Sequence, residues 1–130
     1  MSKLVRVDDE TESLATKVIG AAIEVHRVFG PGFQEVTYHR ALRIELEDTG
    51  ISVQSEAPVE LRYKKRSIGE GRIDMLVEQK LVVELKAAQG NSNAYRRQVA
   101  TYLHASGLKL GLVINFENAV LRDGIARVLA

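Results

Sequence analysis

The chain has 130 residues, of which 45% are hydrophobic and 27% charged, with a net charge of +1. These values predict one globular domain and exclude a bulk positive charge, so any nucleic-acid binding must come from a local basic patch. The absence of cysteine excludes disulfides, zinc–thiolate sites and cysteine nucleophiles, and it is typical of a cytoplasmic protein. A polar, acidic start and the lack of an apolar run of about 18 residues predict neither a signal peptide nor a membrane span.

Two helices are predicted in the first part of the chain, after a flexible arm at residues 1–10. Apolar residues recur at spacings of three and four from Thr11 to Phe29, which predicts the first helix. The turn Gly30-Pro31-Gly32 should end it. The second helix is expected from Gln34 to Thr49, with Gly50 as its C-terminal cap.

The rest of the chain predicts mainly strands. In chain order we expect a strand at 51–63 interrupted near Ala57-Pro58, a basic turn at 63–71, strands at 72–78 and 81–87, a helix at 94–105, a buried central strand at 110–116, and a last segment at 119–129 that is a strand or, less favoured, a helix. This order predicts an α/β sandwich with helices on both sides of a mixed sheet, formed by a single domain at 11–130.

Three charged residues stand where a core strand should carry apolar side chains. Asp74 follows Gly71-Arg72-Ile73, and Glu84 and Lys86 interrupt the apolar run that begins at Val82. Unpaired buried charge costs several kcal/mol, so strands rarely carry such residues unless they bind something. Two carboxylates and an ammonium that converge on one point can hold a divalent metal beside a phosphate.

The three charged side chains come together only if the predicted strands at 72–78 and 81–87 pair in a suitable register. Glu84 and Lys86 share a strand face with Val82, because side chains alternate. Antiparallel partners whose numbers sum to 158 would place Asp74 opposite Glu84 and leave 78–80 as a three-residue loop. An odd sum would separate the carboxylates, and a solvated edge hairpin with Lys86 as the ion partner is the plainer alternative. Apolar neighbours on both faces favour an interior hairpin.

Three polar side chains lie on the apolar stripes of predicted helices. Glu35 shares a face with Tyr38 and Leu42 near the start of the second helix. Glu35 could reach the strand site, or it could only favour the helix dipole. Gln98 and Tyr102, four residues apart in the third helix, could orient a water or contact a phosphate, or could simply mark the edge of an apolar face.

Basic residues near these candidates would contact the phosphates of a nucleic acid. They are Lys64, Lys65 and Arg66 in the predicted turn, Arg72 beside Asp74, and Arg96 and Arg97 in the third helix. Contacts of this kind make binding dependent on salt and independent of sequence. Simple solvent exposure is the alternative for each of the two helix arginines taken singly.

Four motifs follow one another along the chain. They are Gly32-Phe33-Gln34-Glu35-Val36-Thr37-Tyr38, Gly71-x-x-Asp74, Glu84-x-Lys86 and Gln98-x-x-x-Tyr102. Their order resembles the RecB-like nucleases of the PD-(D/E)xK superfamily, and the first motif is the full signature of its small bacterial GxxExxY branch. The resemblance covers about residue 18 to the end. Ile73 stands where a proline is usual, and Glu35 stands in place of the RecB-like histidine.

This resemblance implies a restriction endonuclease-like fold and a nuclease that hydrolyses phosphodiester bonds of DNA with Mg²⁺ or Mn²⁺. The implied metal ligands are Glu35, directly or through water, with Asp74, Glu84 and the Leu85 backbone carbonyl. Lys86 would orient the attacking water or stabilise developing negative charge. Gln98 and Tyr102 would position water or the phosphodiester.

A non-catalytic nucleic-acid-binding or assembly module with the same fold is the main alternative. The presence of both carboxylates and the lysine favours an enzyme. Small size and a modest net charge favour the module, or a homo-oligomer that pools its basic patches. A small-molecule hydrolase is a third interpretation.

Overall fold

A computed structural model describes residues 6–90 and 92–130. Its elements are α1 (Asp9–Phe29), α2 (Glu35–Asp48), β1 (Val53–Tyr63), β2 (Arg66–Val77), β3 (Leu81–Lys86), α3 (Ser92–Ser106), β4 (Leu110–Asn115), the 3₁₀ turn η1 (Leu121–Gly124) and β5 (Ile125–Leu129). None of the helices in the described part of the chain has the length and apolar character to cross a membrane.

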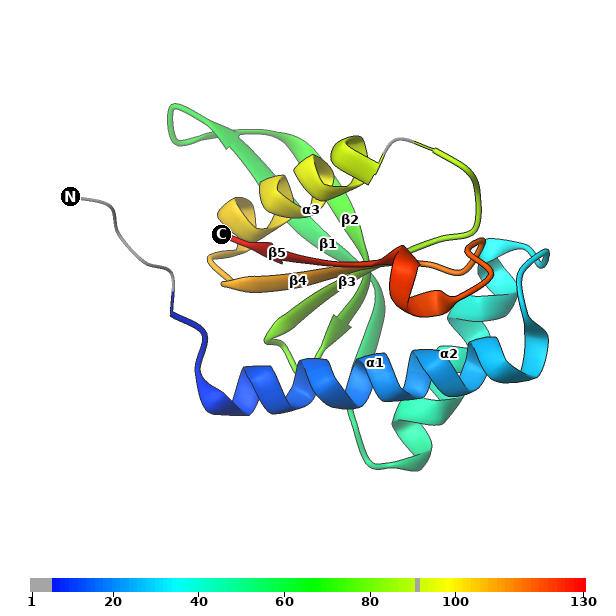
Figure 1. Cartoon of the computed structure of the whole chain (residues 1–130). Helices are drawn as coiled ribbons and strands as arrows, with labels where there is room; N and C mark the ends of the chain where they lie inside the picture. Colours follow the sequence, from blue (N-terminus) through cyan, green and yellow to red (C-terminus); the bar gives the residue numbers. More distant parts are fainter. Residues whose placement is uncertain (1–5, 91) are drawn as a thin grey trace.

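The five strands form one mixed sheet in the order β1-β2-β3-β4-β5. β3 and β4 run parallel and are joined by α3, whereas the other neighbouring strands are antiparallel. Helices α1 and α2 cover one face and α3 covers the other (Figure 1). The predicted α/β sandwich is confirmed, and the favoured strand at the C-terminal end is β5, preceded by η1.

Two apolar clusters fill the space on the two faces of the sheet. One joins α1 and α2 to residues such as Val83 and Leu85 of β3. The other joins α3 to Val82 of β3 and Val113 of β4. Side chains therefore alternate along β3 as the sequence predicts, and the structure adds that the even-numbered ones face α3 and the odd-numbered ones face α1 and α2.

Helix α1 begins earlier than expected, at Asp9. The Asp8 carboxylate caps it by accepting bonds from the Thr11 backbone N–H at 3.2 Å and the Thr11 hydroxyl at 2.7 Å. Because this cap satisfies an otherwise unpaired N–H of the first turn, residues 9 and 10 are helical. The predicted arm at 1–10 is wrong for these two residues, and its first five lie outside the described residues.

The basic turn predicted at 63–71 is mostly strand. β2 starts at Arg66, so the turn consists of Lys64 and Lys65 alone, with φ angles of 48° and 67°. Two central residues with positive φ match the type I′ turn, whose twist suits an antiparallel hairpin. β1 and β2 therefore form one long hairpin that extends beyond the rest of the sheet (Figure 1). Lys-Lys lacks the usual Asn-Gly signature of this turn, which is why the sequence pattern does not indicate it.

Tyr38 fixes the turn that leads into α2. Its ring stacks on Phe116 with centroids 4.3 Å apart, and the residue is fully buried. Its hydroxyl donates to the Gly30 carbonyl at 2.6 Å and accepts from the Phe33 N–H at 3.2 Å. Gly32 in the same turn has a φ of 107°, which disfavours any residue with a side chain. The start of α2 is thus set by a buried anchor and a glycine turn.

We expect Tyr38→Phe to lower the free energy of unfolding by about 1–3 kcal/mol, because the Gly30 carbonyl and Phe33 N–H would lose a buried partner. Urea denaturation measures the change. Tyr63→Phe is the matched control, because Tyr63 is 62% exposed. Equal shifts in the two variants would contradict the anchoring role of Tyr38.

Candidate active site

The candidate site lies where β2 separates from β3. The two strands pair through Met75 with Val83, and then through 76 with 82 and 77 with 81. These numbers sum to 158, so the predicted register and the three-residue loop at 78–80 are confirmed. The next residues, Asp74 and Glu84, face each other beyond the last of these pairs.

Side chains replace the backbone ladder at this point. The Asp74 N–H donates to Glu84 Oε1 at 3.0 Å, and the Leu85 N–H donates to Asp74 Oδ2 at 2.9 Å. Each carboxylate thus binds the backbone of the opposite strand through one oxygen. The two carboxyl groups also hydrogen-bond each other. These reciprocal bonds hold the two acids side by side at the split in the sheet.

Glu84 is 2% exposed, and its environment disfavours the ionised form. Burial, reinforced by the negative charge of Asp74, raises the pKa of Glu84 to about 8. The Asp74 N–H and the Lys86 ammonium act in the opposite direction but do not cancel it. Without a cation, the site therefore favours the protonated form of Glu84.

Lys86 shares the α3-facing side of β3 with Glu84 and contacts α3. Its Nζ lies 3.5 Å from Gln98 Oε1 and 4.9 Å from the centre of the Tyr95 ring. Gln98 Nε2 in turn donates to the Tyr102 hydroxyl at 3.3 Å. Lys86, Gln98 and Tyr102 therefore form one chain of contacts, and Tyr95, which the sequence reasoning missed, provides a ring beneath the ammonium.

Gly71 allows α3 to approach the strand that carries Asp74. A Cβ atom at Gly71 would lie 2.6 Å from Cε1 of the Tyr102 ring, which real structures do not tolerate without a shift. The glycine three residues before Asp74 is thus a contact surface for Tyr102. This contact brings the Gln98–Tyr102 face of α3 against β2.

Glu35 reaches the same point from the first residue of α2. It lines a cleft of about 390 Å³. The lining residues are Glu35, Val36, His39, Arg40, Glu56 and Asp74. Burial and then the charge of Asp74 raise the pKa of Glu35, helped by a hydrogen bond between the two carboxyls, while Lys86 lowers it. The structure therefore brings Glu35 to Asp74.

Glu56 of β1 is a further acid in this cleft that the sequence reasoning missed. The β1–β2 ladder pairs Ser55 with Met75 and Ala57 with Ile73, so Glu56 stands opposite Asp74. Glu56 has a φ of 53°, which interrupts regular pairing. This irregularity lies one residue before the break expected near Ala57-Pro58. Asp74 is consequently flanked by an acid on each neighbouring strand.

The carboxylate oxygens of Asp74 and Glu84 suit a hard divalent cation, although the described side chains do not form a complete coordination shell. Within residues 6–90 and 92–130, no three His, Cys, Asp or Glu side chains form a ready-made metal-binding group. Mg²⁺, however, is commonly held by one or two carboxylates together with waters and substrate phosphates. The Leu85 carbonyl leaves the strand on the same side as its N–H, which points to Asp74.

The predicted basic residues differ in how close they lie to the candidate site at Asp74. Arg72 is exposed two residues before Asp74 on β2. Arg96 and Arg97 are exposed at the start of α3, and Arg96 lines a separate cleft of about 520 Å³. Lys64, Lys65 and Arg66 are at the hairpin tip, eight or more residues along the strands from Asp74, and do not join the site.

The raised pKa of Glu84 predicts that the metal-free protein loses stability as pH rises. Between the ordinary value of 4.5 and about 8, the folded state holds a proton that the unfolded state has released. The unfolding free energy should fall across this window by a few kcal/mol and then level off. The raised pKa of Glu35 acts with the same sign.

Urea denaturation in EDTA at pH 5, 6.5 and 8 measures this dependence. Glu84→Gln should flatten it, whereas Asp9→Asn, at an exposed position in the first turn of α1, should retain it. A slope that is the same in Glu84→Gln as in the wild type would contradict this assignment.

Comparison with known proteins agrees with this arrangement. A family model described as the PD-(D/E)XK nuclease superfamily matches residues 12–128. Searches of curated proteins and of solved structures gave no match. The match spans all the helices and strands apart from the ends of α1 and β5, and it confirms the predicted restriction endonuclease-like fold. The chain belongs to the PD-(D/E)XK nuclease superfamily.

Proposed function

We propose that this protein is a divalent-metal-dependent nuclease of the GxxExxY branch that hydrolyses phosphodiester bonds of DNA. The observation that carries the proposal is the reciprocal bonding of Asp74 and Glu84 beside Lys86. Membership of the superfamily indicates nuclease activity, a nucleic-acid partner and general use of divalent metals. The finer points, DNA and Mg²⁺ or Mn²⁺, rest on the chemistry of the donors.

Asp74 and Glu84 would hold the cation through the oxygens that do not bind backbone, with the Leu85 carbonyl as a third ligand. Glu35 would complete the set directly or through water. When bound, the cation lowers the pKa of a coordinated water and neutralises charge on the scissile phosphate. The buried, protonated Glu84 must release its proton for this, so cation binding should strengthen as pH rises toward 8.

Lys86 would place its ammonium at the phosphate and stabilise the negative charge that develops there. Its contact with Gln98 and its position over Tyr95 restrict the directions that the side chain can take. Gln98 and Tyr102 would orient the attacking water or the phosphodiester. Because they touch each other and Lys86, the group is positioned before substrate arrives.

Arg72, Arg96 and Arg97 would contact phosphates near the site, since all three are exposed. The GxxExxY assignment is supported by a distinct role for each signature residue. Gly32 takes a positive φ, Glu35 faces Asp74, and Tyr38 anchors the turn. The cytoplasmic location and a homo-oligomeric state stay predictions.

A non-catalytic nucleic-acid-binding or assembly module is the second candidate. It is favoured by the lack of a ready-made ligand group among the described side chains and by the protonated state of Glu84 without a cation. Under this alternative the two acids would serve to close the split in the sheet.

We expect the wild-type protein to cut DNA with Mg²⁺ or Mn²⁺ and not in EDTA. Asp74→Asn and Lys86→Ala should each lower the rate by about 10²–10³-fold, because the first removes a ligand of the cation and the second removes the ammonium that stabilises the developing charge. Gel assays on single- and double-stranded DNA and on RNA measure the rates. Lys109→Ala, which removes an exposed charge just before β4, should keep wild-type activity.

Unchanged cleavage by Asp74→Asn and Lys86→Ala would place the active site elsewhere. A wild-type protein that binds DNA but cuts no substrate, and for which calorimetry detects no Mg²⁺ or Mn²⁺ binding, would favour the second candidate.

A further inference from the structure

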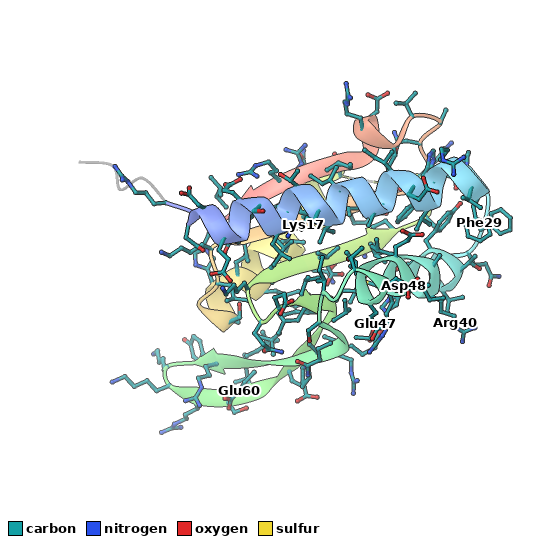
Figure 2. All side chains as sticks on the ribbon, turned by 90° about the horizontal axis from the view of Figure 1, so that it is seen from below. Lys17, Phe29, Arg40, Glu47, Asp48 and Glu60 are labelled. Atoms are coloured by element: carbon teal, nitrogen blue, oxygen red, sulfur yellow. The ribbon has the colours of Figure 1, made fainter. Side chains whose placement is uncertain are left out.

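The outer half of the β1–β2 hairpin is a two-stranded ribbon that stands away from the sheet. Within the described residues, β3 pairs with β2 only at positions 75–77. Toward the turn, the strand partner of β2 is β1, in pairs that continue to Tyr63 with Arg66. Figure 2 shows the hairpin with Glu60 on it, extending away from the end of the molecule where Phe29 and Arg40 lie.

Positive charge is concentrated on this ribbon. Residues 60–72 contain five Lys or Arg and two Glu, which gives +3, whereas the whole chain carries +1. Arg62 is neutralised by Glu60 at 2.9 Å. Lys64, Lys65 and Arg66 form no salt bridge with any carboxylate in the part of the chain that the structure describes. The turn and the first residue of β2 therefore present three unneutralised cations to solvent.

The ribbon also exposes apolar surface that packing within this domain does not use. Tyr63 is 62% exposed and Ile68 is 67% exposed. Tyr63 follows Arg62 and precedes the two turn lysines, and Lys64 Nζ lies 5.4 Å from the centre of its ring. A cationic tip with one aromatic and one aliphatic side chain suits a partner that offers phosphates beside an apolar groove wall.

The geometry of β2 sets the distance between the tip and the site. Asp74 and Arg66 belong to the same strand and are eight residues apart. At about 3.3 Å per residue, the separation is roughly 26 Å. Successive phosphates along one strand of B-DNA are about 3.4 Å apart along the axis, so this distance corresponds to about eight base pairs.

We propose that the β1–β2 hairpin is an arm that grips duplex DNA about eight base pairs from the phosphate bound at Asp74. The proposal rests on the proposed nuclease function for the second contact point. It extends that function by naming the substrate as a duplex and by giving it a minimum length.

Two properties of the arm favour B-form duplex over other nucleic acids. Proteins that bind single strands use series of aromatic rings as stacking platforms, and residues 59–72 contain one aromatic residue, Tyr63. A two-stranded ribbon fits the major groove of B-DNA, which is about 12 Å wide. The major groove of A-form RNA is deep and narrow and does not admit such an element.

The test measures binding by fluorescence anisotropy with Ca²⁺ in place of Mg²⁺, so that a cation with oxygen ligands can hold the phosphate at the site, with DNA duplexes of 8, 12, 16 and 24 base pairs. The arm variant is Lys64→Asn with Lys65→Gly, which removes two charges while supplying the residues that a type I′ turn prefers. The control, Lys17→Gln with Lys109→Gln, removes the same charge from exposed positions outside the arm. A 16-nucleotide single strand and a 16-base-pair RNA duplex complete the set.

Wild-type affinity should rise steeply between 8 and 16 base pairs, when the duplex first spans both contact points. The arm variant should lack this rise, bind the 16-base-pair duplex about tenfold more weakly, and show a salt slope smaller by about 2. The control should behave as wild type. The single strand and the RNA duplex should show little difference between variant and wild type.

The proposal is overturned if the arm variant retains the rise with length, if the control loses as much affinity, or if the single strand or RNA loses as much as the DNA duplex. Cleavage of the 24-base-pair duplex with Mg²⁺, measured alongside binding, distinguishes failure of the arm proposal from failure of the nuclease proposal. If the wild-type protein cleaves DNA but its affinity does not rise between 8 and 16 base pairs, only the arm proposal is overturned. If the rise in affinity with duplex length is present in the wild type and absent in the arm variant, but the wild type cleaves no DNA, the arm proposal is supported and the nuclease function is overturned.

Discussion

The separation of β2 from β3 at Asp74 is the constraint on which the site depends. When two strands part inside a protein, their backbone N–H groups lose ladder partners, and each unsatisfied group costs about 1–3 kcal/mol. The carboxylates of Asp74 and Glu84 supply the missing acceptors for the N–H groups of Asp74 and Leu85. The residues that close the split are therefore the same ones that we propose as cation ligands. Under this proposal the structural and chemical roles coincide, because both need carboxylates at this place.

Placing the carboxylates of Asp74 and Glu84 side by side creates electrostatic repulsion, which neighbouring residues of the site reduce. Two adjacent carboxylates, one of them buried, cannot both ionise easily, and the raised pKa of Glu84 records the cost. Lys86 offsets part of it from the same face of β3, and α3 holds Lys86 through Gln98. A bound cation would relieve the conflict more completely than a proton, because it neutralises both acids at once. The same arrangement that strains the metal-free protein thus favours metal binding.

The sequence predicts those parts of the site that follow from periodicity. Strand alternation and the length of the loop at 78–80 are enough to place Asp74 opposite Glu84 and Lys86 on the same strand face as Glu84. Helical spacing is enough to put Gln98 and Tyr102 on one face. The parts that depend on residues in unusual backbone conformations are missed. A positive φ at Lys64 and Lys65 lengthens β2, and one at Glu56 breaks the regular alternation of β1 that would have located this acid.

The split in the sheet also explains why the hairpin projects. Once β3 leaves β2 at Asp74, β1 is the only strand among the described residues that continues beside the outer part of β2, while α3 contacts β2 where Tyr102 meets Gly71. A single strand therefore carries the central carboxylate at one point and the basic tip eight or more residues further on. Because strand rise is nearly constant, the number of residues between the two sets their separation along the strand. A contact at the tip would then fix which phosphate reaches Asp74, so the geometry that opens the site would also set the register of the substrate.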